Sequence, residues 1–231
     1  MVERNSAPSP RTAARATGAV YLLYFLTSIL GAVAYGGLAP SASTILANET
    51  AFRWGFALGL VSSVCYVAVV GLLYRLLRHV GRTPAFLAVL FGLMGSAITA
   101  VASLLQLGPL VIAGRTAFTA DQLHALSKIF VDMGAQAGYI ALVFFGMFQL
   151  LLGYLIVRST FLPRILGWLI ALAGLGWLTF LSPPLAMHVK NYLYVFGFVA
   201  ELALMLWLLI AGVNVERWNA LAHPAEVSTG A

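Results

Sequence analysis

Long apolar runs, separated by short polar or turn-forming segments, follow one another from residue 16 to residue 213. Each run is long enough to cross about 30 Å of hydrocarbon at about 1.5 Å per residue. The runs lack the alternation of barrel strands, and a backbone in lipid must form its own hydrogen bonds, so they predict helices. The expected spanning segments are Ala16–Ala39, Trp54–Leu77, Pro84–Ala113, Gln136–Val157, Pro163–Met187 and Asn191–Val213.

The flanking segments are more polar than the runs. Residues 1–15 contain Ser, Pro and three arginines and predict a disordered tail. Residues 214–231 form a second short tail. The expected organisation is therefore an all-α bundle of six spanning helices over residues 16–213, between two tails.

Two connections on one side of the bundle have amphipathic patterns. Apolar residues punctuate residues 41–52, and they recur at helical spacing in residues 118–133. Thr119 and Gln122 fit a capping box at the start of the second segment. We expect both to form short amphipathic helices lying on the outer interface, the second running into the fourth span.

Glycine and proline motifs mark contacts and breaks. Gly55 and Gly59 form a GxxxG motif, which predicts close approach of another helix. Gly-Pro at residues 108–109 and Ser-Pro-Pro at residues 182–184 interrupt two runs near their outer ends. Broken helices can expose backbone groups to ions, but near an interface such motifs are more typical of the end of a span.

The composition agrees with a membrane protein. Of the residues, 61% are hydrophobic and 9% are charged, and the mean hydropathy is +0.96. Soluble domains carry about 25% charged residues, so an ordinary soluble domain, a disordered chain and a nucleic-acid-binding protein are excluded. The single cysteine, Cys65, excludes an internal disulfide and a CxxC metal site.

The basic residues predict the orientation. Nine of the 13 Lys and Arg residues fall in the two tails and in the second and fourth connections. Cytoplasmic loops are enriched in Lys and Arg, so both termini are expected in the cytoplasm. An alternative is cleavage of the first helix after Ala32-Val33-Ala34, which would leave five spans and an N-terminus outside.

Several segments carry a resemblance to a known family. The most distinctive segment is the stretch around the LPRILG turn. The four segments are FFGMFQLLLGYLIVRSTFLPRILGWLIALAG (residues 144–174), AVYLLYFLTSILG (19–31), FRWGFAL (52–58) and AELALMLWLLIAGVN (200–214). Together they resemble the DUF4386 family of bacterial membrane proteins. The resemblance implies a multi-pass protein of the bacterial inner membrane, and it brings no known reaction or cofactor.

Glu201 is the most informative residue for function. It lies about ten residues into the last expected span, near the bilayer midplane. A carboxylate is costly there, so it is treated as a functional site by default. It could bind a proton, a cation or another ligand, or it could be a neutral acid that joins helices by hydrogen bonds. The polar residues expected at similar depth are Ser62, Ser63, Ser96 and Thr99, and Gln149 is expected somewhat nearer the cytoplasm; all five are proposed with Glu201 as ligand- or proton-binding candidates.

A second candidate cluster lies on the outer face. Arg53 could pair with Glu49, Asp121 or Asp132 and pin the outer helices to the bundle. The alternative is an ordinary interfacial anchor beside Trp54. Neither a haem pattern of inward-facing histidines nor a metal-binding motif is present in the sequence, so no metal or cofactor is expected.

Three functions remain open from the sequence. The first is a small-molecule or ion binding or transport protein built around Glu201. The second is a structural or regulatory subunit of a membrane complex without its own ligand. The third, an enzyme acting on an apolar substrate, would need a second acid, base or metal near Glu201. The expected partners are the lipid bilayer and another membrane protein or a second copy of the chain, but not nucleic acid.

Overall fold

The computed structural model describes residues 9–34, 47–112 and 117–222. Within these ranges the chain is helical and contains no strand. Six helices are long and apolar enough to cross a membrane. The elements are α1 (Pro10–Ala34), α3 (Glu49–Leu77), α4 (Arg82–Gln106), α5 (Gly108–Ile112), α6 (Ala120–Arg158), α7 (Arg164–Leu178), the 3₁₀ helix η1 (Thr179–Leu181), α8 (Pro183–Ile210) and α9 (Val215–Ala222).

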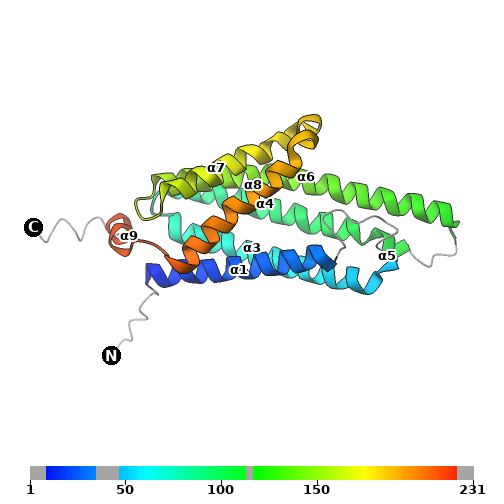
Figure 1. The fold of residues 1–231 in the computed structure, drawn as a ribbon, viewed down its shortest axis with the longest axis horizontal. Helices are drawn as coiled ribbons and strands as arrows, with labels where there is room; N and C mark the ends of the chain where they lie inside the picture. Colours follow the sequence, from blue (N-terminus) through cyan, green and yellow to red (C-terminus); the bar gives the residue numbers. More distant parts are fainter. Residues whose placement is uncertain (1–8, 35–46, 113–116, 223–231) are drawn as a thin grey trace, which may run out of the picture.

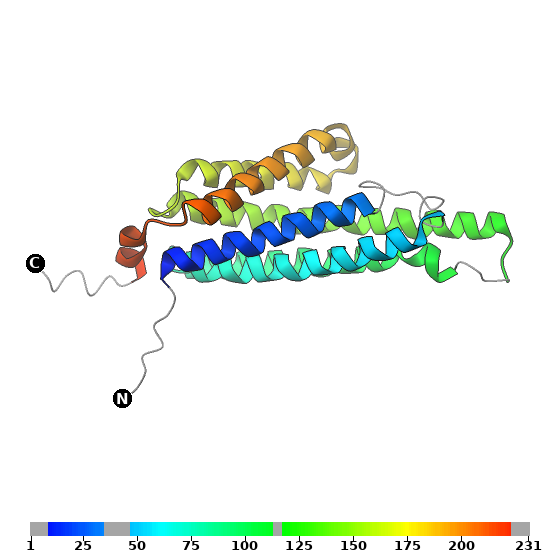
Figure 2. The same ribbon diagram turned by 60° about the horizontal axis from the view of Figure 1, so that its bottom comes forward.

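The long helices form one bundle. Helix α1 packs on α3 and α8, α4 packs on α3 and α6, and α7 packs on α6 and α8. Figures 1 and 2 show that α8 crosses the bundle obliquely, with its last turns beside the start of α1. The start of α1, the α3–α4 turn, the α6–α7 turn and α9 all lie at the same end (Figure 1), which we call the basic end after its arginines.

Small residues bring helix backbones together. A Cβ atom on Gly31 of α1 would lie 3.4 Å from the carbonyl oxygen of Gly55 and 3.6 Å from the nitrogen of Gly59, which confirms the close contact predicted from the GxxxG motif. Helices α6 and α7 approach more closely still. Two glycine pairs meet there in antiparallel register, Gly146 with Gly174 and Gly153 with Gly167.

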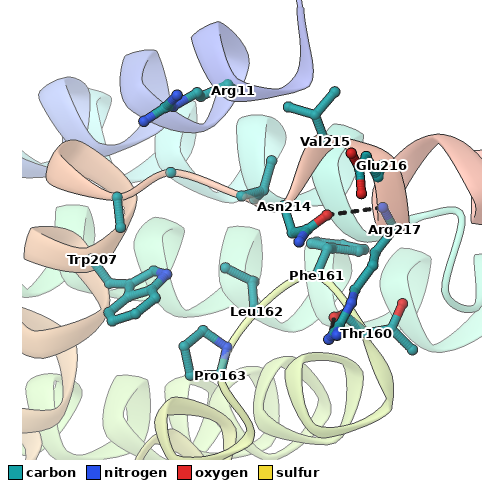
Figure 3. A pocket seen from close by; sticks show the side chains of 13 residues that line it. Arg11, Thr160, Phe161, Leu162, Pro163, Trp207, Asn214, Val215, Glu216 and Arg217 are labelled. Atoms are coloured by element: carbon teal, nitrogen blue, oxygen red, sulfur yellow. Dashed lines mark hydrogen bonds between the residues drawn. The ribbon is translucent and has the colours of Figure 1, made fainter.

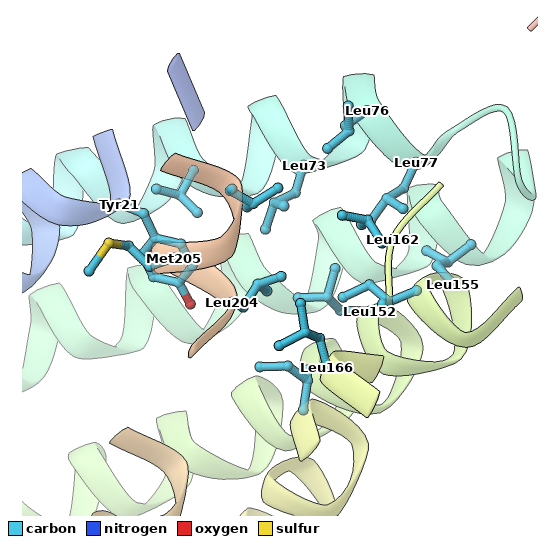
Figure 4. Close-up of a cluster of buried hydrophobic side chains, with 14 of the residues drawn as sticks. Tyr21, Leu73, Leu76, Leu77, Leu152, Leu155, Leu162, Leu166, Leu204 and Met205 are labelled. Atoms are coloured by element: carbon cyan, nitrogen blue, oxygen red, sulfur yellow. The ribbon is translucent and has the colours of Figure 1, made fainter. Parts of the chain in front are cut away.

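A hydrophobic core fills the basic half of the bundle. Leucines of α3 and α6 meet Leu204 and Met205 of α8 and Leu162 of the α6–α7 turn (Figure 4). Residues on the opposite faces of the same helices, such as Val64, Ile140 and Ile210, are apolar and exposed. An apolar outer face around a packed core is what a lipid environment requires, and the chain is a multi-pass helical membrane bundle.

Several helix ends differ from the expected ones. Helix α1 begins at Pro10, inside the segment expected to be a disordered tail, and α9 lies in the expected C-terminal tail. The fifth span ends at Leu181 rather than Met187, and α8 begins at Pro183. A proline is favourable in the first turn of a helix because its missing N–H has no partner there, so the proline pair begins α8 instead of ending α7.

The two amphipathic connections also differ from expectation. The Thr119–Gln122 capping box is present, with both reciprocal hydrogen bonds formed. It opens a helix of 39 residues that continues without a break into the fourth span, so no separate helix lies across the outer surface there. In the first connection, Glu49–Phe52 form the first turn of α3, and residues 41–46 lie outside the described part of the chain.

Candidate functional site

Glu201 and Gln149 lie at the same depth in the bundle. Glu201 is nine residues before α8 ends at Ile210, and Gln149 is nine residues before α6 ends at Arg158. Both ends are at the basic end, so each side chain is roughly 14 Å inside it. This distance is about half the thickness of the hydrocarbon core of a bilayer.

A hydrogen bond joins these two side chains. Nε2 of Gln149 donates to Oε1 of Glu201 at 2.5 Å and so connects α6 with α8. Gln149 is 1% exposed, whereas Glu201 is partly exposed. The amide oxygen of Gln149, Oε1, is buried without a hydrogen-bond partner among the described residues. The pair therefore keeps one acceptor unused beside the carboxyl group.

Three tyrosines complete this site. The Tyr21 hydroxyl of α1 lies close to the Glu201 carboxyl group. Tyr24 of α1 and Tyr66 of α3 lie within electrostatic range of the same group, and their ring centroids are 4.9 Å apart. We call Glu201, Gln149 and these three tyrosines the Glu201 cluster. It draws residues from four different helices into the middle of the bundle.

Phenylalanines extend the aromatic surroundings of the cluster. Phe145 of α6 lies 5.2 Å from Tyr66 between ring centroids, in an edge-to-face arrangement. Phe25 of α1 contacts both Tyr21 and Phe198 of α8. A carboxyl group bordered by aromatic rings combines a negative charge with the electron-rich ring faces that attract cations.

The three tyrosines were not among the candidate site residues predicted from the sequence. One signal was available, because Tyr21, Tyr24 and Phe25 follow the i, i+3, i+4 spacing of a single helix face. Their convergence with Tyr66 on Glu201 depends on how α1 and α3 pack, which the spacing does not specify.

The four hydroxyl candidates lie apart from the carboxyl group or are occupied. Ser62 is buried and its hydroxyl donates to the carbonyl oxygen of Tyr24 at 3.5 Å, so it joins α3 to α1 near the cluster. The other three hydroxyls donate to the carbonyl four residues earlier in their own helix; these residues are Ser63, Ser96 and Thr99. Such back-bonding satisfies a hydroxyl in lipid without a partner from another helix.

The expected outer-face cluster separates into local pairs. Arg53 pairs with Glu49 at 2.8 Å, and Asp132 pairs with Lys128 at 2.6 Å. Both pairs span one helical turn and are exposed, so each adds little to stability. Asp121, in the first turn of α6, takes part in neither ion pair. In the described ranges no three His, Cys, Asp or Glu residues come together as a metal site would require.

A pocket of about 610 Å³ lies at the basic end, away from Glu201. Four segments meet around it: the start of α1, the α6–α7 turn, the end of α8 and the linker to α9 (Figure 3). Arg11 and Arg217 line it together with Trp207. The sequence analysis did not find this pocket, because these residues are far apart along the chain.

Comparison with known proteins identifies the family. No curated protein and no solved structure matches the chain. The sequence profile of one family, described as a domain of unknown function (DUF4386), matches residues 16–212 and so covers all six spanning helices. That is the family suggested by the LPRILG region. The chain therefore belongs to the DUF4386 family.

Proposed function

We propose that this protein binds a cation, either a proton or a small positively charged molecule, at the Glu201 cluster, and that it serves in cation binding or transport. The observation that carries the proposal is the Glu201 carboxyl group itself. It lies at mid-bundle depth, and no Lys or Arg in the described part of the chain pairs with it. A carboxylate in apolar surroundings must be neutralised, and without a basic side chain a proton or a bound cation does so.

The surroundings favour an organic ammonium ion over a bare metal ion. The Glu201 carboxyl group and the unused Gln149 Oε1 supply three side-chain oxygen atoms, one of which already accepts the hydrogen bond from Gln149. The rings of Tyr21, Tyr24 and Tyr66 pack against one another close to the same carboxyl group. Small metal ions need about six oxygen ligands, whereas an ammonium group is held by a carboxylate and aromatic faces.

A structural role is the second candidate, and one observation favours it. Neither the pocket at the basic end nor a smaller one between Val70 and Leu155 is lined by Glu201 or Gln149. In this reading Glu201 is a neutral acid whose hydrogen bond holds α8 against α6. Such bonds in membranes contribute roughly 0.6–2 kcal/mol.

Cation-dependent thermal stability of the purified full chain tests the proposal. The probes are sodium, potassium and tetrapropylammonium chloride at equal ionic strength. A cation that binds the folded protein stabilises it by about 2.7 kcal/mol at one hundred times its dissociation constant. We expect at least one probe to raise the melting temperature of the wild type and of Glu49→Gln, which loses an exposed carboxylate, but not of Glu201→Gln.

A lipophilic carbodiimide gives an independent measurement on the wild type. The reagent couples to protonated carboxyl groups, and mass spectrometry locates the adduct. We expect an adduct on Glu201 that forms faster at low pH and is suppressed by the stabilising cation. The cation site would be overturned if no cation changed the melting temperature of the wild type and none changed the carbodiimide labelling of Glu201. Equal melting temperatures of the wild type and Glu201→Gln, with a lower value for Glu201→Leu, would then support the structural role.

A further inference from the structure

The pocket at the basic end is held open by contacts between segments that are distant in sequence. Gly212 has φ of 71°, a left-handed conformation that ends α8 and turns the chain toward α9. The next segment is fixed by two hydrogen bonds to the α6–α7 turn. The Asn214 backbone N–H donates to the carbonyl of Phe161 at 3.2 Å, and Arg217 Nη1 donates to the carbonyl of Thr160 at 3.1 Å. These two bonds hold the linker and α9 against the α6–α7 turn, and these segments line the pocket.

The polar part of the pocket is cationic. Arg11 and Arg217 lie on either side of the linker between α8 and α9 (Figure 3), and Glu216 is the one acid in the lining. Arg217 has further N–H groups besides the one bound to Thr160. The guanidinium of Arg11 has no hydrogen-bond or ion-pair partner in residues 9–34, 47–112 and 117–222, and its methylene stem packs on Gly212.

Backbone donors add to this positive charge. Helix α9 begins at Val215 in the pocket lining, so the positive end of its dipole faces the same space. The side chain of Asn214 accepts a hydrogen bond from the Arg217 backbone N–H at 3.0 Å. It does not cap the backbone N–H groups of Val215 and Glu216, which lie in the same first turn of α9. A helix N-terminus beside two arginines is suited to an anion with several oxygen acceptors, such as a phosphate group.

Much of the remaining lining is apolar. Phe161, Leu162 and Val213 are buried, whereas Trp207 is exposed on the bundle surface. Trp207 lies one turn before the end of α8, where a tryptophan marks the membrane interface. A small soluble anion makes no favourable contact with apolar walls, whereas an amphiphile with an acidic headgroup contacts them through its apolar part. Basic pockets between helix ends bind lipid headgroups in this way.

We infer that this pocket is a binding site for the phosphate headgroup of an anionic phospholipid, with Arg11 and Arg217 as the charged contacts. The acyl chains of the lipid leave the pocket along the apolar face that Trp207 borders. The inference is independent of the Glu201 cluster, because it uses different residues and a ligand of opposite charge.

Lipid titration of the purified full chain tests this site. The probes are dioleoylphosphatidylglycerol, dioleoylphosphatidylcholine and inorganic phosphate, and the readouts are bound lipid by native mass spectrometry and melting temperature. We expect phosphatidylglycerol to bind in a saturable manner, with phosphatidylcholine and inorganic phosphate weaker by about tenfold or more. The double variant Arg11→Gln/Arg217→Gln should lose about tenfold or more in affinity for phosphatidylglycerol.

The matched control is Arg82→Gln, which removes an exposed arginine at the same end outside the pocket. It should bind phosphatidylglycerol as the wild type does. Should the double variant fail to fold, the single variant Arg11→Gln replaces it, since that guanidinium has no hydrogen-bond or ion-pair partner among the described residues. Equal affinities of the arginine variants and the Arg82 control, or saturation by inorganic phosphate without preference for the anionic lipid, would overturn the inference.

Discussion

Gly153→Ala tests whether the α6–α7 interface depends on backbone contact. A Cβ atom at Gly153 would lie 2.6 Å from the carbonyl oxygen of Gly167 and 2.7 Å from the backbone nitrogen of Ala171. Backbone atoms cannot rotate away as a side chain does, so the methyl group must push the two helices apart. Gly138 provides a matched control in the same helix, because a Cβ atom there meets nothing within 4 Å.

The expected magnitude follows from two opposing effects. In a helix interior, Ala is favoured over Gly by about 1 kcal/mol, and both variants gain this amount. Only Gly153→Ala also carries the cost of overpacking, which is about 1–3 kcal/mol. Taking roughly 2 kcal/mol for the clash, Gly153→Ala should melt about 4–8 °C below Gly138→Ala.

Thermal unfolding of the two purified variants, followed by tryptophan fluorescence, measures this difference directly. Trp177 of α7 is buried, and a Cβ atom on Gly146 of α6 would lie 3.2 Å from its Cβ, so its fluorescence reports on the separation of the two helices. A melting temperature of Gly153→Ala equal to or above that of Gly138→Ala would show that the helices do not meet through their backbones at this point.

Two further substitutions test local contacts at opposite ends of the bundle. Thr119→Ala removes the capping box at a cost of about 1 kcal/mol in helix stability. It should accelerate amide hydrogen exchange in the first turn of α6 and leave exchange near Gln149 unchanged. Unchanged exchange in the first turn would contradict the capping contact. Trp218→Phe keeps an aromatic ring but loses the hydrogen bond from Nε1 to the carbonyl oxygen of Leu76, which is worth about 1 kcal/mol. It should increase amide hydrogen exchange across α9. An unchanged exchange rate would mean that this bond does not hold the helix in place.

The spanning helices were predictable because lipid leaves the backbone few choices. An apolar run in hydrocarbon must be a helix, so the number of spans follows from the length of the runs. The ends were harder to predict, because water can complete the hydrogen bonds of a helix that continues past the hydrocarbon. Thus α1 begins at Pro10 among polar residues, and α8 begins at Pro183 rather than at Asn191.

The candidate site was only partly predictable. Glu201 stands out in any sequence of this kind because of the cost of a carboxylate in lipid, and Gln149 was grouped with it by depth alone. Depth does not specify which helix face a residue occupies. For this reason Ser63 and Thr99, at similar depth, bond to their own helices, whereas Tyr21 and Tyr66 approach the carboxyl group.

The packing also explains why a polar contact lies where α8 meets α6. On one side, α6 and α7 meet through paired glycines; on the other, a Cβ atom on Gly18 of α1 would lie 2.5 Å from the backbone nitrogen of Leu209 of α8. In each of these two pairs of helices the backbones are in close contact. In the described residues, the Gln149–Glu201 bond is the one side-chain hydrogen bond that joins α6 to α8. A bond of this kind in a membrane contributes roughly 0.6–2 kcal/mol, so a ligand bound at Glu201, as proposed above, would act on the side-chain contact that joins the two pairs of helices.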